Sequence, residues 1–285
     1  PPTGVFTIGA GDPAYSKTRS VTLSSAVNGV VDMRFRNAAD DFNPLPGEWT
    51  PWTPWVSSVL FTLAAGDTEK GVDAEFRDQA LNVLALQDVI TLDTVKPSSV
   101  VTTTGGYGPL TWPGEVRGTA SDALSGVVQV ALRCSRADSG AFWNGLNWVS
   151  EETWVVASGT TSWGLALPET DLPEAVTLTV VSVSRDAAGN EQALGAGTTL
   201  HYDSTSPSGT FAIAGAGVVA VPAASVSLVS EVTGAVRMRF RNAGGSWSVW
   251  QPYESTRAWS LATGDGAKTV DAEYQDEVSN GLALT

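Results

Sequence analysis

Three pairs of Asp and Asn residues with the same spacing are the side chains best suited to chemistry in this sequence. The pairs are Asp78 with Asn82, Asp186 with Asn190, and Asp276 with Asn280. Calcium prefers six to eight oxygen ligands, drawn from carboxylates, amide side chains and backbone carbonyls. Because Asp93 and Asp203 lie in segments that join predicted modules, the pattern predicts calcium sites at module junctions. The candidate ligands are Asp78, Asn82, Asp93, Asp186, Asn190 and Asp203. The alternative is that each pair only bonds the backbone of its own turn, and it is favoured because no cluster of acidic residues is as dense as in an EF-hand type loop.

Tryptophan supplies a second candidate site, since aromatic rings stack on sugars. Trp49 and Trp52 recur as Trp247 and Trp250 at matched positions, which favours a packing role. The segment FWNGLNW occurs once, and its Trp143 and Trp148 are therefore the predicted glycan ligands.

Catalytic patterns are missing from the sequence. The single histidine, His201, has no GxSxG motif near it, and the acidic residues lie alternately on strands or in turns. Neither a phosphate-binding Gly loop nor a Cys/His metal set is present. We expect no enzyme and no cofactor apart from calcium.

Charge and cysteine content limit the partners further. The net charge of −14 would repel nucleic acid, whose binding depends on Lys and Arg neutralising phosphates. The only cysteine, Cys134, excludes a disulfide within the chain, and its alternation with Val130 and Leu132 places it on a buried strand face. The segment lacks the run of about 18 apolar residues that would span a membrane.

An internal repeat sets the organisation that must position these residues. The segment GVFTIGAG at 4–11 matches GTFAIAGA at 209–216, and MRFRN at 33–37 recurs at 238–242, both with an offset of 205. After seven extra residues around Asp40 and Asp41 the offset becomes 198 and remains constant. The first and last thirds of the chain are therefore copies of one module.

Apolar and polar residues alternate with a period of two through the matched segments, as in strands that bury one face. Arg34 and Arg36 point outward in this pattern and are expected opposite Asp73 and Glu75 on a neighbouring strand. A different module between the copies has predicted strands near 126–134, 161–167 and 175–185. We therefore predict three domains, 1–97, 98–207 and 208–285, joined by short Pro-containing linkers into an extended rod.

The segments MRFRNAGGSWSVWQPY and VDAEYQD, with their partners in the first copy, resemble bacterial immunoglobulin-like repeats of large cell-surface proteins. GTASDALSGV and SRDAAGN in the middle module are similar to another repeat type of the same proteins. This resemblance implies all-β, tandem Greek-key sandwiches in an extracellular or cell-surface spacer, adhesin stalk or coat. The implied partners are further repeats or copies of the chain, and surface glycans or proteins.

The third module stops where the first continues into QDVITLDTVKP, so we expect it to lack its last strand. An open edge would then remain beside Val270, Ala272 and Tyr274, with unpaired backbone groups. Completion of that edge by a strand of another subunit, giving a filament, is the second functional hypothesis. Carbohydrate binding through Trp143 and Trp148 is the third.

Overall fold

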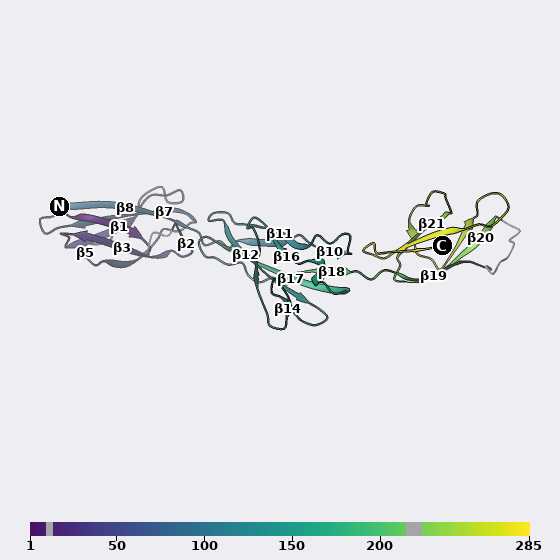
Figure 1. Cartoon of the computed structure of the whole chain (residues 1–285). Coiled ribbons are helices and arrows are strands. Elements are labelled where there is room, and N and C mark those ends of the chain that lie inside the picture. The colour runs from purple at the N-terminus through teal and green to yellow at the C-terminus, as the bar shows by residue number, and fades with distance from the viewer. Residues whose placement is uncertain (10–13, 215–223) are drawn as a thin grey trace.

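Three β-sandwiches follow one another along the chain and lie end to end (Figure 1). The computed structural model describes residues 1–9, 14–214 and 224–285. Its regular elements are strands and one short 3-10 helix, η1 (Glu169–Asp171), so the prediction of tandem all-β sandwiches is confirmed. Residues 10–11 and 215–216, at the ends of the first matched segments, lie outside the described residues. The described part contains no helix that is long and apolar enough to cross a membrane.

The first sandwich packs a three-stranded sheet on a five-stranded one. The smaller sheet has the order β1-β3-β6, with β1 (Thr3–Ile8), β3 (Ser20–Asn28) and β6 (Ser58–Thr62). The larger sheet has the order β2-β8-β7-β4-β5, with β2 (Tyr15–Ser16), β8 (Val83–Leu92), β7 (Thr68–Arg77), β4 (Asp32–Asn37) and β5 (Thr53–Pro54). Alternating side chains of both sheets form its core, in which Phe35 stacks on Phe6 at 5.9 Å between ring centroids and meets Phe76 edge-on.

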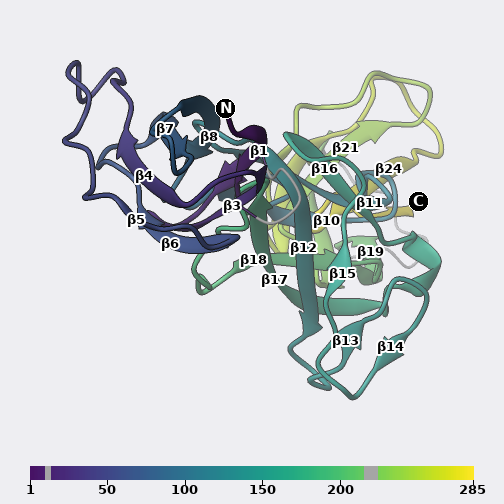
Figure 2. The same cartoon turned by 90° about the vertical axis from the view of Figure 1, so that its left-hand side faces the viewer.

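The second sandwich also packs a three-stranded sheet on a larger one, which here has seven strands. One sheet has the order β16-β11-β9, with β16 (Ser162–Ala166), β11 (Glu115–Ser121) and β9 (Ser98–Val101). The other has the order β10-β18-β17-β12-β13-β14, with β10 (Gly105–Tyr107), β18 (Thr198–Asp203), β17 (Ala175–Asp186), β12 (Val127–Arg136), β13 (Phe142–Trp143) and β14 (Trp148–Val149), while β15 (Val155–Val156) pairs with β12. Seen end-on, the hairpin of β13 and β14 projects from the side of the rod (Figure 2).

The third sandwich repeats the first. Its sheets have the orders β19-β20-β23 and β22-β21-β24-β25, with β19 (Ser208–Ile213), β20 (Ser225–Thr233), β23 (Thr256–Ser260), β22 (Gln251–Pro252), β21 (Arg237–Asn242), β24 (Val270–Gln275) and β25 (Gly281–Leu284). Phe240 occupies the position of Phe35, and it stacks on Phe211 at 5.8 Å. The repeat in the sequence is thus reproduced in the packing of the core.

The prediction that the third sandwich lacks its last strand is wrong. Residues Gly281–Leu284 form β25, which pairs with β24 from Ala272 to Gln275. The turn after Gln275 returns the chain into the sheet, as it does after Arg77 in the first sandwich. The predicted open edge at Val270, Ala272 and Tyr274 is therefore covered over most of its length, and the three side chains are buried in the core.

Arg and Trp side chains alternate on the outer face of β4 and β7. The guanidinium of Arg34 lies 4.7 Å from the ring of Trp49 and 4.5 Å from that of Trp52, and the same stack recurs around Arg239 in the third sandwich. Arg34 also bonds Glu75 and Arg36 bonds Asp73 across the sheet, which confirms the predicted pairing. The repeated tryptophans thus pack against arginines of their own sheet.

The seven-residue insertion of the first sandwich brings one carboxylate into its interior. The Nζ of Lys70 lies 2.8 Å from Oδ2 of Asp40, and the two side chains are only 1% and 4% exposed. Burial raises the pKa of Asp40, but hydrogen bonds from Lys70, Asn43 and Phe42 outweigh it and hold that pKa below its usual value. The insertion loop is therefore anchored by a buried ion pair.

Candidate functional site

The first junction is the segment from Asp93 to Pro97, between β8 and β9, together with the turn at residues 186–190. Asp93 directly follows β8 and is completely buried. Its backbone N–H donates to the carbonyl of Ser16 at 2.9 Å, and its carbonyl accepts the side-chain amide of Asn190 at 2.8 Å. Asp93 therefore bonds both the first sandwich and the second.

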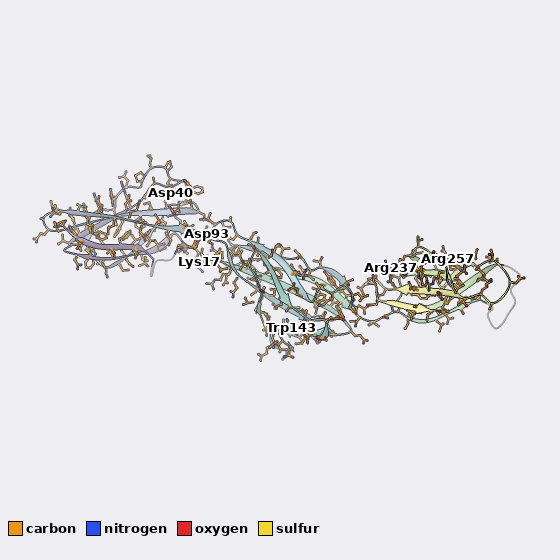
Figure 3. All side chains as sticks on the ribbon, turned by 45° about the horizontal axis from the view of Figure 1, so that its top comes forward. Lys17, Asp40, Asp93, Trp143, Arg237 and Arg257 are labelled. Atoms are coloured by element: carbon orange, nitrogen blue, oxygen red, sulfur yellow. The ribbon has the colours of Figure 1, made fainter. Side chains whose placement is uncertain are left out.

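Asp186 and Asn190 shape the turn that receives this linker. Asp186 ends β17, and its two carboxylate oxygens accept the backbone N–H of Asn190 at 2.7 Å and its side-chain amide at 2.8 Å. Gly189 takes a positive φ of 87° within the turn, a conformation that costs glycine little. The Nζ of Lys17 donates to the carbonyl of Gly189 at 3.2 Å, and Figure 3 shows Lys17 and Asp93 near this junction. The turn thus contacts the linker and the end of the first sandwich.

Asp122 adds a third carboxylate from the loop after β11. Its Oδ2 accepts the backbone N–H groups of Leu124, Ser125 and Gly126 at 2.9 to 3.1 Å. Its Oδ1 is buried and has no hydrogen-bond partner in the part of the chain that the structure describes. The loop therefore fixes the carboxylate while leaving one oxygen unused.

Oxygens of Asp93, Asp122 and Asp186 lie within 4.8 Å of one another. Asp93 is 0% exposed and Asp186 is 1% exposed. Among the described residues, no Lys or Arg forms an ion pair with any of the three, whereas buried Asp40 has Lys70 as its partner. Buried charges that lack a counterion are costly, so the cluster is electrostatically suited to a cation.

Oxygen ligands from three carboxylates suit a hard divalent cation of the calcium type. Calcium–oxygen distances of roughly 2.3 to 2.6 Å allow oxygens up to about 5 Å apart to share one ion, which agrees with the observed separation. Zinc is less suitable because Cys134 lies in the core of the second sandwich and His201 lies on β18. Oδ1 of Asp122 makes no hydrogen bond among the described residues, so Asp122 keeps one oxygen available as a ligand.

The second junction repeats the hydrogen bonds of the first without its carboxylate cluster. The side-chain amide of Asn280 donates to the carbonyl of Asp203 and to Oδ2 of Asp276, both at 2.8 Å. The carboxylate of Asp203 accepts the N–H of Thr205. Within the described part of the chain, three acidic groups come within reach of one ion only at the first junction.

The remaining predicted calcium ligands, Asp78 and Asn82, lie at the other end of the first sandwich. They bond each other across the turn between β7 and β8, while Asp93 follows the far end of β8. The hydrogen bonds from Asn82 lower the pKa of Asp78. Of the six predicted ligands, the structure brings together Asp93, Asp186 and Asn190, and the amide of Asn190 serves as a hydrogen-bond donor there.

Asp122 was not among the predicted ligands, although it belongs to the segment GTASDALSGV. An Asp followed by small residues and Gly is typical of a turn that accepts several N–H groups, and the sequence carries this signal. Its approach to Asp93, which belongs to another sandwich, comes only from the three-dimensional arrangement.

The predicted glycan site is wrong at Trp143. Its side chain is 1% exposed in the core of the second sandwich, and its Nε1 donates to the carbonyl of Ala166; Figure 3 labels it within that sandwich. Trp148 is partly buried between Trp143 and Arg136. The absence of a second copy of FWNGLNW suggested a ligand site, but Trp143 bonds β16 and Trp148 packs on Arg136 of β12.

His201 and Cys134 take ordinary structural positions. The ring of His201 is exposed and lies near the hydroxyl of Thr177. Cys134 is completely buried, as its alternation predicted, and burial raises the pKa of its thiol to about 12.

No protein-family model matches the sequence, and no curated protein matches it either. A solved structure titled for host cell surface retention of a 1.5-MDa bacterial ice-binding adhesin is 12% identical, with 99% of this chain and 95% of that chain covered and a TM-score of 0.39. A Ca²⁺-stabilised adhesin of an Antarctic bacterium is 16% identical, with coverages of 99% and 72% and a TM-score of 0.34. A tetra-tandem repeat from the extending region of a large adhesion protein is 15% identical, with coverages of 99% and 73% and a TM-score of 0.29. Values this low carry no functional argument.

Proposed function

We propose that this chain is a structural segment of an extracellular bacterial surface protein, in which sandwiches joined end to end form a stiff stalk. The observation that supports this most strongly is the burial of the linker residue Asp93 between two sandwiches. A freely flexible linker would leave its backbone in water, whereas Asp93 has its N–H, carbonyl and carboxylate all bonded. Junctions of this kind would fix the orientation of each sandwich relative to the next.

Both linkers are also bonded to the sandwich that precedes them. Thr94 donates from its N–H and hydroxyl to the carboxylate of Asp67. Ser204 donates in the same way to the carbonyl of Glu174, at 2.7 and 3.1 Å. Pro97 and Pro207 end the linkers, and proline restricts the backbone further. These contacts support a role as a rigid spacer rather than as a flexible tether.

We further propose that the first junction binds a calcium ion. Asp93 comes from the linker, while Asp122 and Asp186 belong to the second sandwich, so one ion would hold the two units together. Among the described residues, no Lys or Arg pairs with the acidic cluster, and Oδ1 of Asp122 has no hydrogen-bond partner; both observations support a bound cation. Binding there would neutralise part of the cluster and stiffen the joint.

The bacterial surface is the proposed setting because the repeats resemble immunoglobulin-like modules of large surface proteins. The net charge of −14 also suits a soluble, extended segment. Further repeats of the same chain are the proposed partners.

A calcium titration of the full chain with an Asp122→Asn control tests the calcium site. A ligand that binds only the folded state raises its stability by about 2.7 kcal/mol at a hundredfold excess over Kd. We expect calcium to raise the thermal midpoint of the unsubstituted chain and to have a much smaller effect on Asp122→Asn. Equal behaviour of the two proteins, or no response to calcium, would contradict the site.

A further inference from the structure

The turn between β7 and β8 at residues 78–82 has the same internal hydrogen bonds as the turns at both junctions. In each case one Asp oxygen accepts the N–H of the Asn four residues later, and the other accepts the side-chain amide of that Asn at 2.8 Å. The backbone N–H of each Asp donates to the carbonyl of its Asn. We refer to these three turns as linker sockets.

Two sockets are occupied by linkers. The second proton of the Asn190 amide is donated to the carbonyl of Asp93, and that of Asn280 to the carbonyl of Asp203, both at 2.8 Å. Asn190 and Asn280 are each only 9% exposed as a result. An Asp carbonyl in a linker that ends with proline is therefore the shared occupant.

The first socket is exposed. Asn82 donates to Asp78 alone among the described residues, and its side chain is open to solvent. The first sandwich nevertheless begins in the same way as the other two. Pro2 is buried at its start, just as Pro97 and Pro207 are buried at the starts of the others. Both linkers of the described chain are already engaged, so neither can fill this socket.

Two residues beside Asn82 have the character of a contact surface. Leu81 is 67% exposed and has a positive φ of 64°, an unfavourable combination for a branched apolar residue in water. Its counterpart in the second sandwich is Gly189, whose carbonyl binds Lys17 of the preceding sandwich. Ala80 is exposed as well, whereas its counterpart Val278 is 9% exposed and lies against the second sandwich.

Glycine in the preceding sandwich makes the close contact possible at the second junction. A Cβ on Gly106 would lie 2.9 Å from Cγ1 of Val278, and one on Gly108 would lie 2.8 Å from Oδ1 of Asn280. Both glycines lie in or just after the short strand β10 of the second sandwich. The socket thus receives a linker and the end of a sandwich together.

The geometry points to the Asp78–Asn82 turn as a third linker socket, which binds the Asp carbonyl of a linker from another β-sandwich of this kind joined ahead of Pro2. The inference rests on the proposed stalk function and extends it to the N-terminal end of the first sandwich. Leu81 and Ala80 would then contact the end of the added sandwich, as Gly189 and Val278 contact theirs.

A fusion tests this directly. Residues 98–206 are placed ahead of Pro2 in the full chain, which recreates the Asp203-to-Pro linker before the first sandwich. Nitrogen-15 relaxation then gives the rotational correlation time of each sandwich. We expect the added sandwich to tumble with the first, and Asn82→Ala to release the added sandwich alone. Asn280→Ala is the matched control and should release the third sandwich alone.

Independent tumbling of the added sandwich in the unsubstituted fusion would overturn the inference, and so would coupling that survives Asn82→Ala. These outcomes differ from failure of the stalk itself. In that case the second and third sandwiches of the original chain would already tumble independently.

Discussion

The side-chain amide of Asn190 donates a 2.8 Å hydrogen bond to the backbone carbonyl of Asp93, which lies 97 residues earlier in the chain. Asn280 and Asp203 repeat this bond at the next junction. Since Asn190 also bonds Asp186, one amide connects a turn of the second sandwich to the linker that leaves the first. The proposed stiffness of the stalk would depend on this small set of contacts.

Asn190→Ala should loosen the first junction while leaving each sandwich folded. The substitution removes two hydrogen bonds, and a buried bond contributes about 1 kcal/mol net. We expect amide exchange at Asp93 and Val95, measured by NMR, to become about fivefold to thirtyfold faster. Asn82→Ala removes the matching side chain from an exposed turn and should leave these amides unchanged. Unaltered exchange in Asn190→Ala would show that the linker is held by other contacts.

Asp122→Asn should have opposite effects on stability with and without calcium. In a chelator it removes one negative charge from the cluster with Asp93 and Asp186, and relief of like-charge repulsion should raise the thermal midpoint. With calcium it removes a ligand charge, so its midpoint should fall below that of the unsubstituted chain. Differential scanning calorimetry of both proteins in both buffers checks this. A shift in the same direction in both buffers would argue against an ion at this junction.

Asp40→Asn should destabilise the first sandwich in a pH-dependent way. The change leaves Lys70 buried without its counterion, which costs about 3 to 5 kcal/mol. The pKa of Asp40 is lowered in the folded state, so its contribution is present above the unfolded value of about 3.9 and is lost as pH falls through the folded value. Peptides from residues 1–92 should therefore exchange hydrogen much faster in Asp40→Asn than in the unsubstituted chain at pH 7. This difference between the two proteins should shrink below about pH 4. Asp41→Asn, in the exposed part of the same loop, is the control.

Cys134 should resist thiol reagents until the second sandwich unfolds. Its side chain is 0% exposed, and its pKa of about 12 leaves very little thiolate at pH 8. We expect no labelling by a disulfide reagent in native buffer and one label per chain in denaturant. Rapid native labelling would show that the core around β12 and β17 opens far more readily than its packing indicates.

Local and repeated features were predictable from the sequence, and contacts between sandwiches were not. The period-two alternation of the matched segments predicted strands that bury one face, and in β7 the residues Val72, Ala74 and Phe76 are indeed completely buried. The pairing of Arg34 with Glu75 followed from the immunoglobulin-like strand order. The cluster of Asp93 with Asp122 depends on how the linker enters the second sandwich, for which a single sequence carries no signal.

Two wrong predictions have related causes. The third sandwich was expected to lack its last strand because its sequence is shorter than that of the first. The four residues after the turn at Asn280 are nevertheless enough to pair with β24. Trp143 was predicted to bind glycans because its segment FWNGLNW is not repeated, yet β13 directs the ring inward to pack on Trp148. In both cases local backbone pairing decided the outcome.

Small-angle X-ray scattering of the full chain, with calcium and with chelator, tests the central claim that the sandwiches form a stiff stalk. We predict one extended shape with a narrow distribution of lengths in calcium, and a broader distribution in chelator that Asn190→Ala reproduces. A compact particle, or a broad distribution of lengths in calcium, would contradict the account.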